Sequence, residues 1–519
     1  MLFARSFGVA ACTLALLVAR AEADDVYTPP DFMGATPPLP TFIDAAAVWK
    51  LDLAEALQLA VRNNLNISLE RKSVVVADLG IDVAEGAYEP TVTATVNHSS
   101  ADTPPTTAQG GAADQIFTTV NDLWAVGATE RLTTGTQLGI SYGTTRTKSS
   151  LGTAVEPLNY FSSVTLSVTQ PLLHGFSTDL VIPKLPLLTA RIASERERRQ
   201  LAIAATDVIE RTEDAYWDVT QALYTYDLEL RSARRAEDQL ALTKRQIEAG
   251  LLAPSDLIAA ESTLAQRQLR LVQAEDAIGA SWDALRAILN LPRDQWARPI
   301  LPVEVPKFVP EVQSTDAALA IAMKRRPELA QSDLDLESAE LGIRRADNDK
   351  LPEIDVGVTG SVVGQDASYG TTLHQLGAID ASGWSVFMNL TWTPLRRAST
   401  AAAEISRVNQ TMAVSRRDQL VQAIWLAVRE AIRNQKSAGR QVIAAAKSRQ
   451  LAELNLEIEQ RKFLNGTSNN IFVAGRQEEL ASAQLSELGA VLGHKKATAA
   501  VLRATGQLLE ARSIRLDAK

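Results

Sequence analysis

Apolar residues recur at helical spacing along two long stretches of the chain. From Thr189 to Ala249 and from Ala401 to Leu464 they are separated by alternating steps of four and three residues, with no internal proline. This spacing is that of a coiled-coil seam. The seam positions are Leu201, Ala205, Val208, Thr212, Ala215, Val219, Ala222 and Tyr226, and then Val421, Ile424, Val428, Ala431, Gln435, Ala438, Val442 and Ala445. We therefore predict two rod-like helices of about 60 residues, each roughly 90 Å long.

Each predicted rod ends at a glycine turn. Gly250 follows the first rod and Gly466 the second, and polar residues that favour a helix start come soon after both. Glycine is preferred just after a helix, and serine, aspartate or asparagine just before the next one. The chain is thus expected to turn back at both places and to form two long helical hairpins. Two more amphipathic helices are predicted, from Asp52 to Ala87 and from Asp316 to Lys350.

Other segments alternate between apolar and polar residues with a period of two. They lie at Thr91 to Asn97, Val164 to Thr169, Ile354 to Val358 and Val386 to Trp392, and Gly/Ser/Thr/Asp-rich stretches expected to be loops separate them, as at residues 364–383. This alternation is typical of strands with one apolar and one polar face. Four short strands alone would leave unpaired edges, so we expect them to close with strands of other copies.

Such strands match those that cross an outer membrane, provided that the barrel closes. Aromatic residues near the strand ends are candidates for the girdle of such a barrel; an ordinary aromatic core of a soluble sheet is the alternative. The candidates are Tyr160, Phe161, Trp384 and Trp392.

The chain contains an internal repeat. The segment that starts at Ala56 aligns without a gap on the segment that starts at Ala318, an offset of 262, and Pro90 then meets Pro352. Later, Gly250 pairs with Gly466 at an offset of 216. The length therefore reflects two copies of one unit rather than several unrelated domains. We place the first copy at residues 51–290, a proline-rich linker at 291–315, and the second copy with a C-terminal tail at 316–519.

The first copy has extra sequence between its two strands. Residues 98–163 separate the alternating segments there, and within them Leu138, Ile140 and Tyr142 alternate with polar or small residues. This pattern indicates an additional hairpin. The hairpin could be an extracellular plug or could add two strands to a barrel, and the sequence does not decide between them.

The N-terminus is typical of an exported protein. Residues 1–23 combine an arginine near the start, an apolar run and a small-residue cleavage site, and a proline-rich extension follows at 24–50. Lipidation at Cys12 is the alternative. Too few apolar residues precede that cysteine for a lipoprotein signal, and the apolar run continues beyond it. Beyond this segment no apolar run has the length of a membrane-spanning helix.

Composition and motifs argue against nucleic-acid binding and against the common catalytic and metal sites. The chain has 52 Lys and Arg against 61 Asp and Glu, a net charge of −9 that argues against nucleic acid as the main partner. One cysteine and four scattered histidines offer no disulfide framework, zinc site or metalloprotease motif, and no phosphate-binding loop is present. We expect no catalytic site, no cofactor and no metal.

In this order and duplication, the motifs resemble the TolC-type outer-membrane efflux proteins. They are the paired segment starts at Ala56 and Ala318, the strand entries YEPTV and KLPEI, TQPL at Thr169, AYWDV at Ala215, and the turns RQIEAGLLAPSD and RKFLNGTSNN. The resemblance implies a mixed α and β membrane protein that assembles as a homotrimer. Each protomer would give four strands to a shared twelve-stranded outer-membrane β-barrel and its helices to a periplasmic α-helical barrel. Whether the extra hairpin adds strands to this barrel stays open.

The same resemblance implies partners and a site. The trimer would be the exit duct of a tripartite efflux or type I secretion system, coupled to an inner-membrane transporter by a periplasmic adaptor. Its helical tip would contact the adaptor through Gly250, Leu251, Ser255, Gly466, Thr467 and Ser468. Relatives narrow the tip with carboxylates six and nine residues after the second glycine, where this chain has Phe472 and Gly475. The gate is then either apolar, at Phe472, or formed by the remaining acid at a matched position, Asp256.

An exported periplasmic coiled-coil scaffold or adaptor-like protein is the alternative function. Adaptors have long helical hairpins but lack the duplicated unit of strands and rods. The substrate, whether drug, metal, siderophore or protein, and the identity of the pump do not follow from the sequence.

Overall fold

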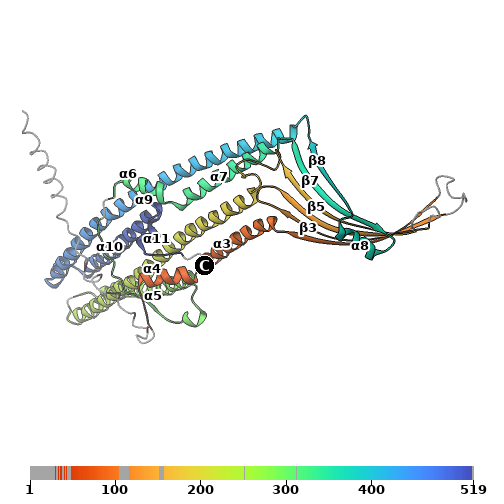
Figure 1. Ribbon diagram of the computed structural model, residues 1–519. Helices are drawn as coiled ribbons and strands as arrows, with labels where there is room; N and C mark the ends of the chain where they lie inside the picture. The colour runs from red at the N-terminus through yellow and green to blue at the C-terminus, as the bar shows by residue number, and fades with distance from the viewer. Residues whose placement is uncertain are drawn as a thin grey trace, which may run out of the picture. The chain divides into compact units, whose positions relative to one another are not determined.

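The protein consists of two compact units (Figure 1). The computed structural model describes residues 48–104, 116–150, 157–250, 252–310 and 313–516, together with residues 30, 33, 36, 37, 40 and 43. The helical unit comprises Met1–Lys72, Arg199–Ala330 and Gln419–Lys519, and the sheet unit comprises Ser73–Arg198 and Gln331–Asp418. The predicted signal peptide and Cys12 lie outside the described residues.

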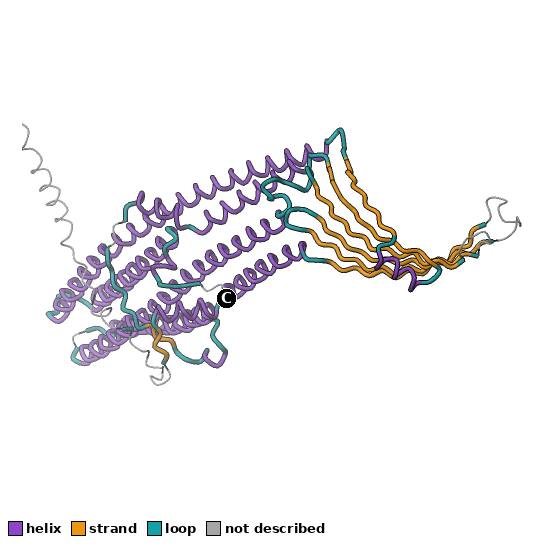
Figure 2. The backbone as a smooth tube through the Cα atoms, in the orientation of Figure 1, coloured by secondary structure: helices purple, strands orange, loops and turns teal. Residues whose placement is uncertain are grey.

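The sheet unit contains one antiparallel six-stranded sheet (Figure 2). Its order is β2-β3-β4-β5-β7-β8, so strands that follow one another along the chain are neighbours. The strands are β2 (Thr91–Thr103), β3 (Phe117–Arg131), β4 (Gln137–Ser149), β5 (Leu158–Pro171), β7 (Glu353–Asp366) and β8 (Ala381–Thr391). All four strands expected from alternation are present and are longer than predicted, because the ladders continue beyond the segments of strict alternation.

The pairing register gathers the apolar positions on one face of the sheet. One row of paired residues runs Val92, Ala128, Ile140, Leu166, Gly360 and Trp384, and a neighbouring row runs Ala94, Val126, Tyr142, Val164 and Val362. The opposite face carries the serines, threonines and glycines that alternate with them. Leu166 is 57% exposed and Val96 is 76% exposed, so nothing in this chain covers most of the apolar face.

The additional hairpin predicted in the first copy forms β3 and β4 and lies inside the sheet. Its turn is packed against the connection that leads from β5 into the next helix. Gly135, at φ +88°, brings its backbone close to Pro171 and Pro183, and Thr136 Oγ1 donates to Gln170 Oε1 at 2.5 Å. The hairpin is thereby tied to β5 at the turn as well as along the strands.

The segment between β7 and β8, expected to be a loop, contains helix α8 (Tyr369–Ala378). This helix contacts β5 and β7. Thr372 is buried, Gly364 lies directly beneath it, and Gln375 Oε1 accepts a hydrogen bond from the Gln365 amide at 2.8 Å. Gly364 and Tyr142 share the apolar face, and the hydroxyl groups of Tyr142 and Tyr369 are 3.0 Å apart. The helix therefore covers one end of that face.

Four helices form the two predicted hairpins: α4 (Leu185–Glu248), α5 (Ser255–Leu289), α9 (Arg397–Leu464) and α10 (Asn470–Ala504). All eight seam residues of α4, from Leu201 to Tyr226, are buried in the helical unit. On α9, Ile424, Val428 and Val442 are buried with Gln435, whereas the other four seam positions are half-buried. The coiled-coil periodicity is therefore confirmed for α4 and holds in part for α9 within one chain.

Each predicted amphipathic helix is broken in two, which corrects the expectation of single helices. The first copy has α2 (Leu53–Asn63) and α3 (Leu65–Glu85), and the second has α6 (Thr315–Arg325) and α7 (Pro327–Asn348). The breaks fall at Asn64 and Arg326, which are 262 positions apart, and both residues have extended backbone. Arg326 precedes a proline, which disfavours helical backbone, and Asn64 donates through Nδ2 to the Ile288 carbonyl at 2.8 Å.

Smaller elements complete the fold. Strands β1 (Trp49–Leu51) and β6 (Ile300–Pro302) pair in parallel, and the short helices are η3 (Gly86–Tyr88), η4 (Arg293–Gln295) and α11 (Leu508–Ala511). Tyr216 of α4 is fully buried beside the β1–β6 pair and donates to the Leu51 carbonyl at 3.2 Å. In the part of the chain that the structure describes, none of the helices has the length and hydropathy of a membrane-spanning helix.

Candidate functional site

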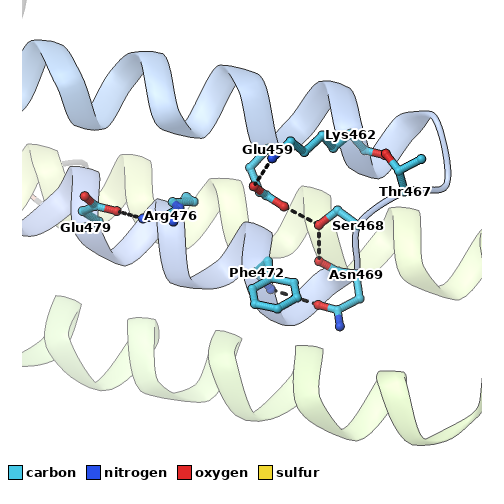
Figure 3. A network of polar contacts seen from close by, with 8 residues as sticks. All are labelled: Glu459, Lys462, Thr467, Ser468, Asn469, Phe472, Arg476 and Glu479. Carbon is cyan, nitrogen blue, oxygen red and sulfur yellow. Dashed lines mark hydrogen bonds and ion pairs between the residues drawn. The ribbon is translucent and has the colours of Figure 1, made fainter.

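The turn between α9 and α10 is closed by Gly466, and Thr467, Ser468 and Asn469 follow it (Figure 3 shows these three residues and their polar contacts). Gly466 has φ +71°, which a residue with a Cβ adopts only at a cost. Its amide donates to the Phe463 carbonyl at 3.0 Å, and the Thr467 amide donates to the Lys462 carbonyl at 3.0 Å. These two bonds satisfy the last carbonyls of α9 in the Schellman arrangement. The sequence-predicted residues Gly466 and Thr467 thus form the end of the rod itself.

Polar side chains hold the next residues of this turn. Ser468 donates to the carboxylate of Glu459, which lies nine residues earlier near the end of α9, and this hydrogen bond lowers the pKa of Glu459. Asn469 caps α10, since its Oδ1 accepts from the Phe472 amide at 3.1 Å. The sequence motif predicted an asparagine near the start of the next helix, and Asn469 takes that place. Sequence reasoning missed Glu459, because this partner of Ser468 lies on the preceding helix and had no local signal.

The first turns of α10 present Phe472 to the surface. Its side chain is 61% exposed, whereas Val473 beside it is buried in the hairpin. At Gly475 no other atom lies within 4 Å of where a Cβ would stand. Arg476 and Glu479 follow on the exposed side and form an ion pair at 2.5 Å. This part of α10 therefore exposes an aromatic ring, a bare glycine and a neutralised charge pair.

The turn between α4 and α5 repeats this backbone design. Gly250 has φ +73°, and its amide donates to the Ile247 carbonyl at 2.9 Å. Leu251 lies outside the described residues. Ser255 is exposed at the start of α5, and Asp256 is half-buried in its first turn. A carboxylate at this end of a helix is favoured by the helix dipole, so Asp256 has a structural role besides its candidacy as a gate.

The two hairpins are joined at and near the start of α10. Gln239 Nε2 of α4 donates to the buried Asn470 Oδ1 of α10 at 2.7 Å. Arg267 and Arg270 of α5 both bind Glu478 of α10, the latter at 2.7 Å. Burial opposes ionisation of Glu478, but the two guanidinium groups outweigh it and lower its pKa. These contacts tie the α4–α5 turn to the α9–α10 turn, and the sequence pattern did not reveal them.

The aromatic candidates divide between the two faces of the sheet. Trp384 is 80% exposed on the apolar face, and Tyr160 lies on that face near the Tyr369 ring of α8, with centroids 5.9 Å apart. Trp392 follows β8 and lies beneath the Arg396 guanidinium. Phe161 alternates with Tyr160 along β5 and so lies on the opposite face, with Ser163 and Thr165. The register also separates them in height, because Trp384 is level with Leu166, whereas Tyr160 pairs with Asp366 at one end of β7 and Trp392 follows β8 at the other end of the sheet. The four residues therefore do not form a single girdle within one chain.

Charge marks the limits of the apolar face. On β3, Asp122 and Glu130 share this face and lie eight residues apart, with Trp124, Val126 and Ala128 between them. Asp122 binds His98 at 2.6 Å and Arg146 at 3.2 Å. Eight residues span about 27 Å of strand, or about 21 Å in height at a tilt near 40°, close to the apolar band of outer-membrane barrels.

No cluster of three metal-binding side chains occurs among the residues that the structure describes.

Comparison with known proteins gives one family and one fold. The family model for outer membrane efflux proteins matches residues 134–291 and 318–507, one segment in each copy of the repeat. A search of curated proteins finds no match.

Three solved outer-membrane channels show the likeness of fold. The CmeC channel of Campylobacter jejuni has a TM-score of 0.66 at 13% identity, with 90% of each chain covered. VceC of Vibrio cholerae scores 0.63 at 12% identity, covering 88% of this chain and 96% of its own. The open MtrE channel of Neisseria gonorrhoeae scores 0.62 at 16%, covering 93% and 97%. The predicted channel fold with an internal repeat is confirmed.

Proposed function

Because the chain belongs to the outer membrane efflux protein family, we propose that three copies of it form the exit duct of a tripartite efflux or secretion system. The observation that carries the proposal is the uncovered apolar face of the six-stranded sheet. An exposed apolar band about 20 Å high matches the lipid-facing band of an outer-membrane barrel, whereas in water it would promote aggregation. A soluble periplasmic scaffold, the alternative function, would leave that face in solvent.

Barrel closure accounts for the two ends of the sheet. Strands β2 and β8 each pair on one side only within the described chain. A membrane strand with an unpaired edge leaves backbone groups without hydrogen bonds, which lipid cannot supply. Pairing β2 of one copy with β8 of the next would satisfy both edges and close a ring.

The helical hairpins would form the periplasmic part of the duct. Helix α4, with 64 residues, is about 96 Å long at 1.5 Å per residue, and α9 has 68 residues. We propose that the two glycine turns receive a periplasmic adaptor, through Gly250 and Ser255 in one and Gly466, Thr467 and Ser468 in the other. Leu251 remains part of this proposal from the sequence alone.

The exposed first turns of α10 suit an apolar gate better than an acidic one. Three copies of Phe472 would bring three exposed rings together, whereas Arg476 and Glu479 neutralise each other. Asp256 is the acid that would add cation selectivity. We assign the chain no catalytic role and no cofactor, since a duct passes its substrate unchanged.

Ion conduction by the purified protein tests this function. Detergent-purified protein added to planar bilayers should produce stepwise conductance, and Phe472→Ala should raise the conductance of the closed state. Matched controls are Ile471→Ala and Leu464→Ala, since both residues are as exposed as Phe472 and lie on the same hairpin. Protein that inserts into bilayers without forming any conducting step would contradict the duct.

A further inference from the structure

The structure gives each copy six consecutive strands rather than four. Building on the trimeric duct proposed above, we propose that the assembled barrel has eighteen strands, so that its outer-membrane end is wider than a barrel of twelve. The additional strands are β3 and β4, and the inference depends on their being wall rather than plug.

Pairing along the whole strand length makes β3 and β4 part of the wall. Every residue of β2, from Thr91 to Thr103, has a partner on β3, and β3 pairs with β4 from Thr119 to Arg131. β4 in turn pairs with β5 from Gln137 to Lys148. A plug that folded into the lumen would have to give up the ladders on both outer sides, and β2 would then have to find β5 directly.

The two faces of the hairpin are in phase with those of its neighbours. Trp124 and Val126 of β3 and Ile140 of β4 lie on the apolar face, and they are 40%, 52% and 50% exposed. In the wall these side chains would face lipid. In a plug they would face the water of the lumen, and burying them in an apolar environment is worth about 1.5–3 kcal/mol each.

The turn between β3 and β4 packs against the end of β5 and the residues that follow it. Gly135, in left-handed conformation, lies within about 3.5 Å of groups on Pro171, Gly175 and Pro183, measured from where its Cβ would stand. The Leu132 amide and the Thr136 carbonyl close the turn at 2.8 Å. The contact between Thr136 and Gln170 then fixes it against the end of β5.

Strand number sets barrel width. With strands about 4.8 Å apart and tilted by about 40°, the backbone radius is about 12 Å for twelve strands and about 18 Å for eighteen. The cross-section therefore grows about 2.2-fold. The lumenal face of the extra strands also carries Leu123 and Arg131, but its central residues are small, as at Gly127, Gly139, Ser141 and Gly143, and leave most of this width open. Helix α8 packs on the opposite, apolar face and does not narrow it.

The chain offers a matched variant with twelve strands. Deleting residues 117–157 removes β3 and β4, and residues 104–116 then connect β2 to β5. The C-terminal end of β2 and the N-terminal end of β5 lie at the same end of the strands. The residues on the apolar face of both strands have even numbers, as Val92 and Leu166 show. The shortened sheet therefore keeps an antiparallel order and one apolar face.

Electron cryomicroscopy of the detergent-solubilised full-length protein tests the inference by counting strands in the barrel. Eighteen strands in a trimer support it; a trimer with twelve, and β3–β4 inside or outside the ring, overturns it while the duct stands. Absence of a trimer would overturn the duct and this inference together.

Polymer exclusion gives a second measurement that does not require the variant to be imaged. Polyethylene glycols of graded size, added on the side of the β-barrel mouth, should enter the wild-type channel up to a radius about 6 Å larger than for the deletion variant. Equal exclusion radii for the two channels would contradict the wider barrel. If the variant fails to fold, the second measurement is disulfide formation between Ser141→Cys and Thr165→Cys in the membrane-embedded trimer, since these residues pair across β4 and β5. Formation of the disulfide supports the wider barrel, and its absence contradicts it.

Discussion

A single arginine on either face of β5 tests which face meets lipid. Leu166 lies on the apolar face in register with Ile140 and Gly360, and Thr165 beside it lies on the opposite face with Ser141 and Ser361. Arginine at the middle of a lipid-facing strand costs about 2–4 kcal/mol. With one copy in each of three protomers, Leu166→Arg should destabilise the trimer by about 6–12 kcal/mol, whereas Thr165→Arg should cost little.

The assay is folding into lipid vesicles, read by protection from protease and by the shift in gel mobility between unheated and heated samples. Wild-type protein and Thr165→Arg should both give a compact, protected species, and Leu166→Arg should not. Thr165→Arg should also lower cation conductance, because its charge would face the pore. Refutation would come from equal folding of the two variants or from the reverse order.

Three further predictions concern the helical part. Arg512 donates to the buried Glu213 carboxylate through Nε at 3.0 Å and Nη2 at 2.5 Å, and Glu213 is 1% exposed. Arg512→Met should lower the free energy of unfolding by about 3 kcal/mol in denaturant titrations, because it leaves a buried carboxylate unpaired. Adding Glu213→Gln should restore much of that loss. Burial raises the pKa of half-buried Glu304 from 4.5 to about 7. Because the folded protein binds this proton more tightly than the unfolded chain, the contribution to the free energy of unfolding is fully present below pH 4.5 and is lost as the pH rises through 7. It amounts to about 1 kcal/mol after allowing for solvent screening. Glu304→Gln should therefore flatten the fall in melting temperature between pH 5 and 8. Asp256→Ala should abolish cation selectivity in planar bilayers, and unchanged selectivity would remove this acid from the pore.

Periodicity predicted the elements of this protein well because each repeats a simple geometric rule. The seam of α4 could be read because every fourth and third residue from Leu201 to Tyr226 faces the same core. Local breaks were harder to predict. Arg326 interrupts its helix because of the following proline, a signal present in the sequence, whereas Asn64 does so through a bond to the distant Ile288 carbonyl.

Pairing partners could not be read from alternation. The pattern at Leu138 to Tyr142 predicted a hairpin, but its place in the sheet depends on the ladders to β2 and β5 and on the contact between Thr136 and Gln170. Similarly, α8 depends on tertiary contact, since it packs on Gly364 of another element. The gate residues Asp256 and Phe472 remain predictions, because their roles depend on copies that one chain does not contain.

Separation of the cell envelope, followed by mass measurement, tests the central claim most directly. The native protein should sediment with the outer membrane, require detergent for extraction, and then have the mass of three chains. A monomer or dimer that is released with the soluble periplasm would contradict the account.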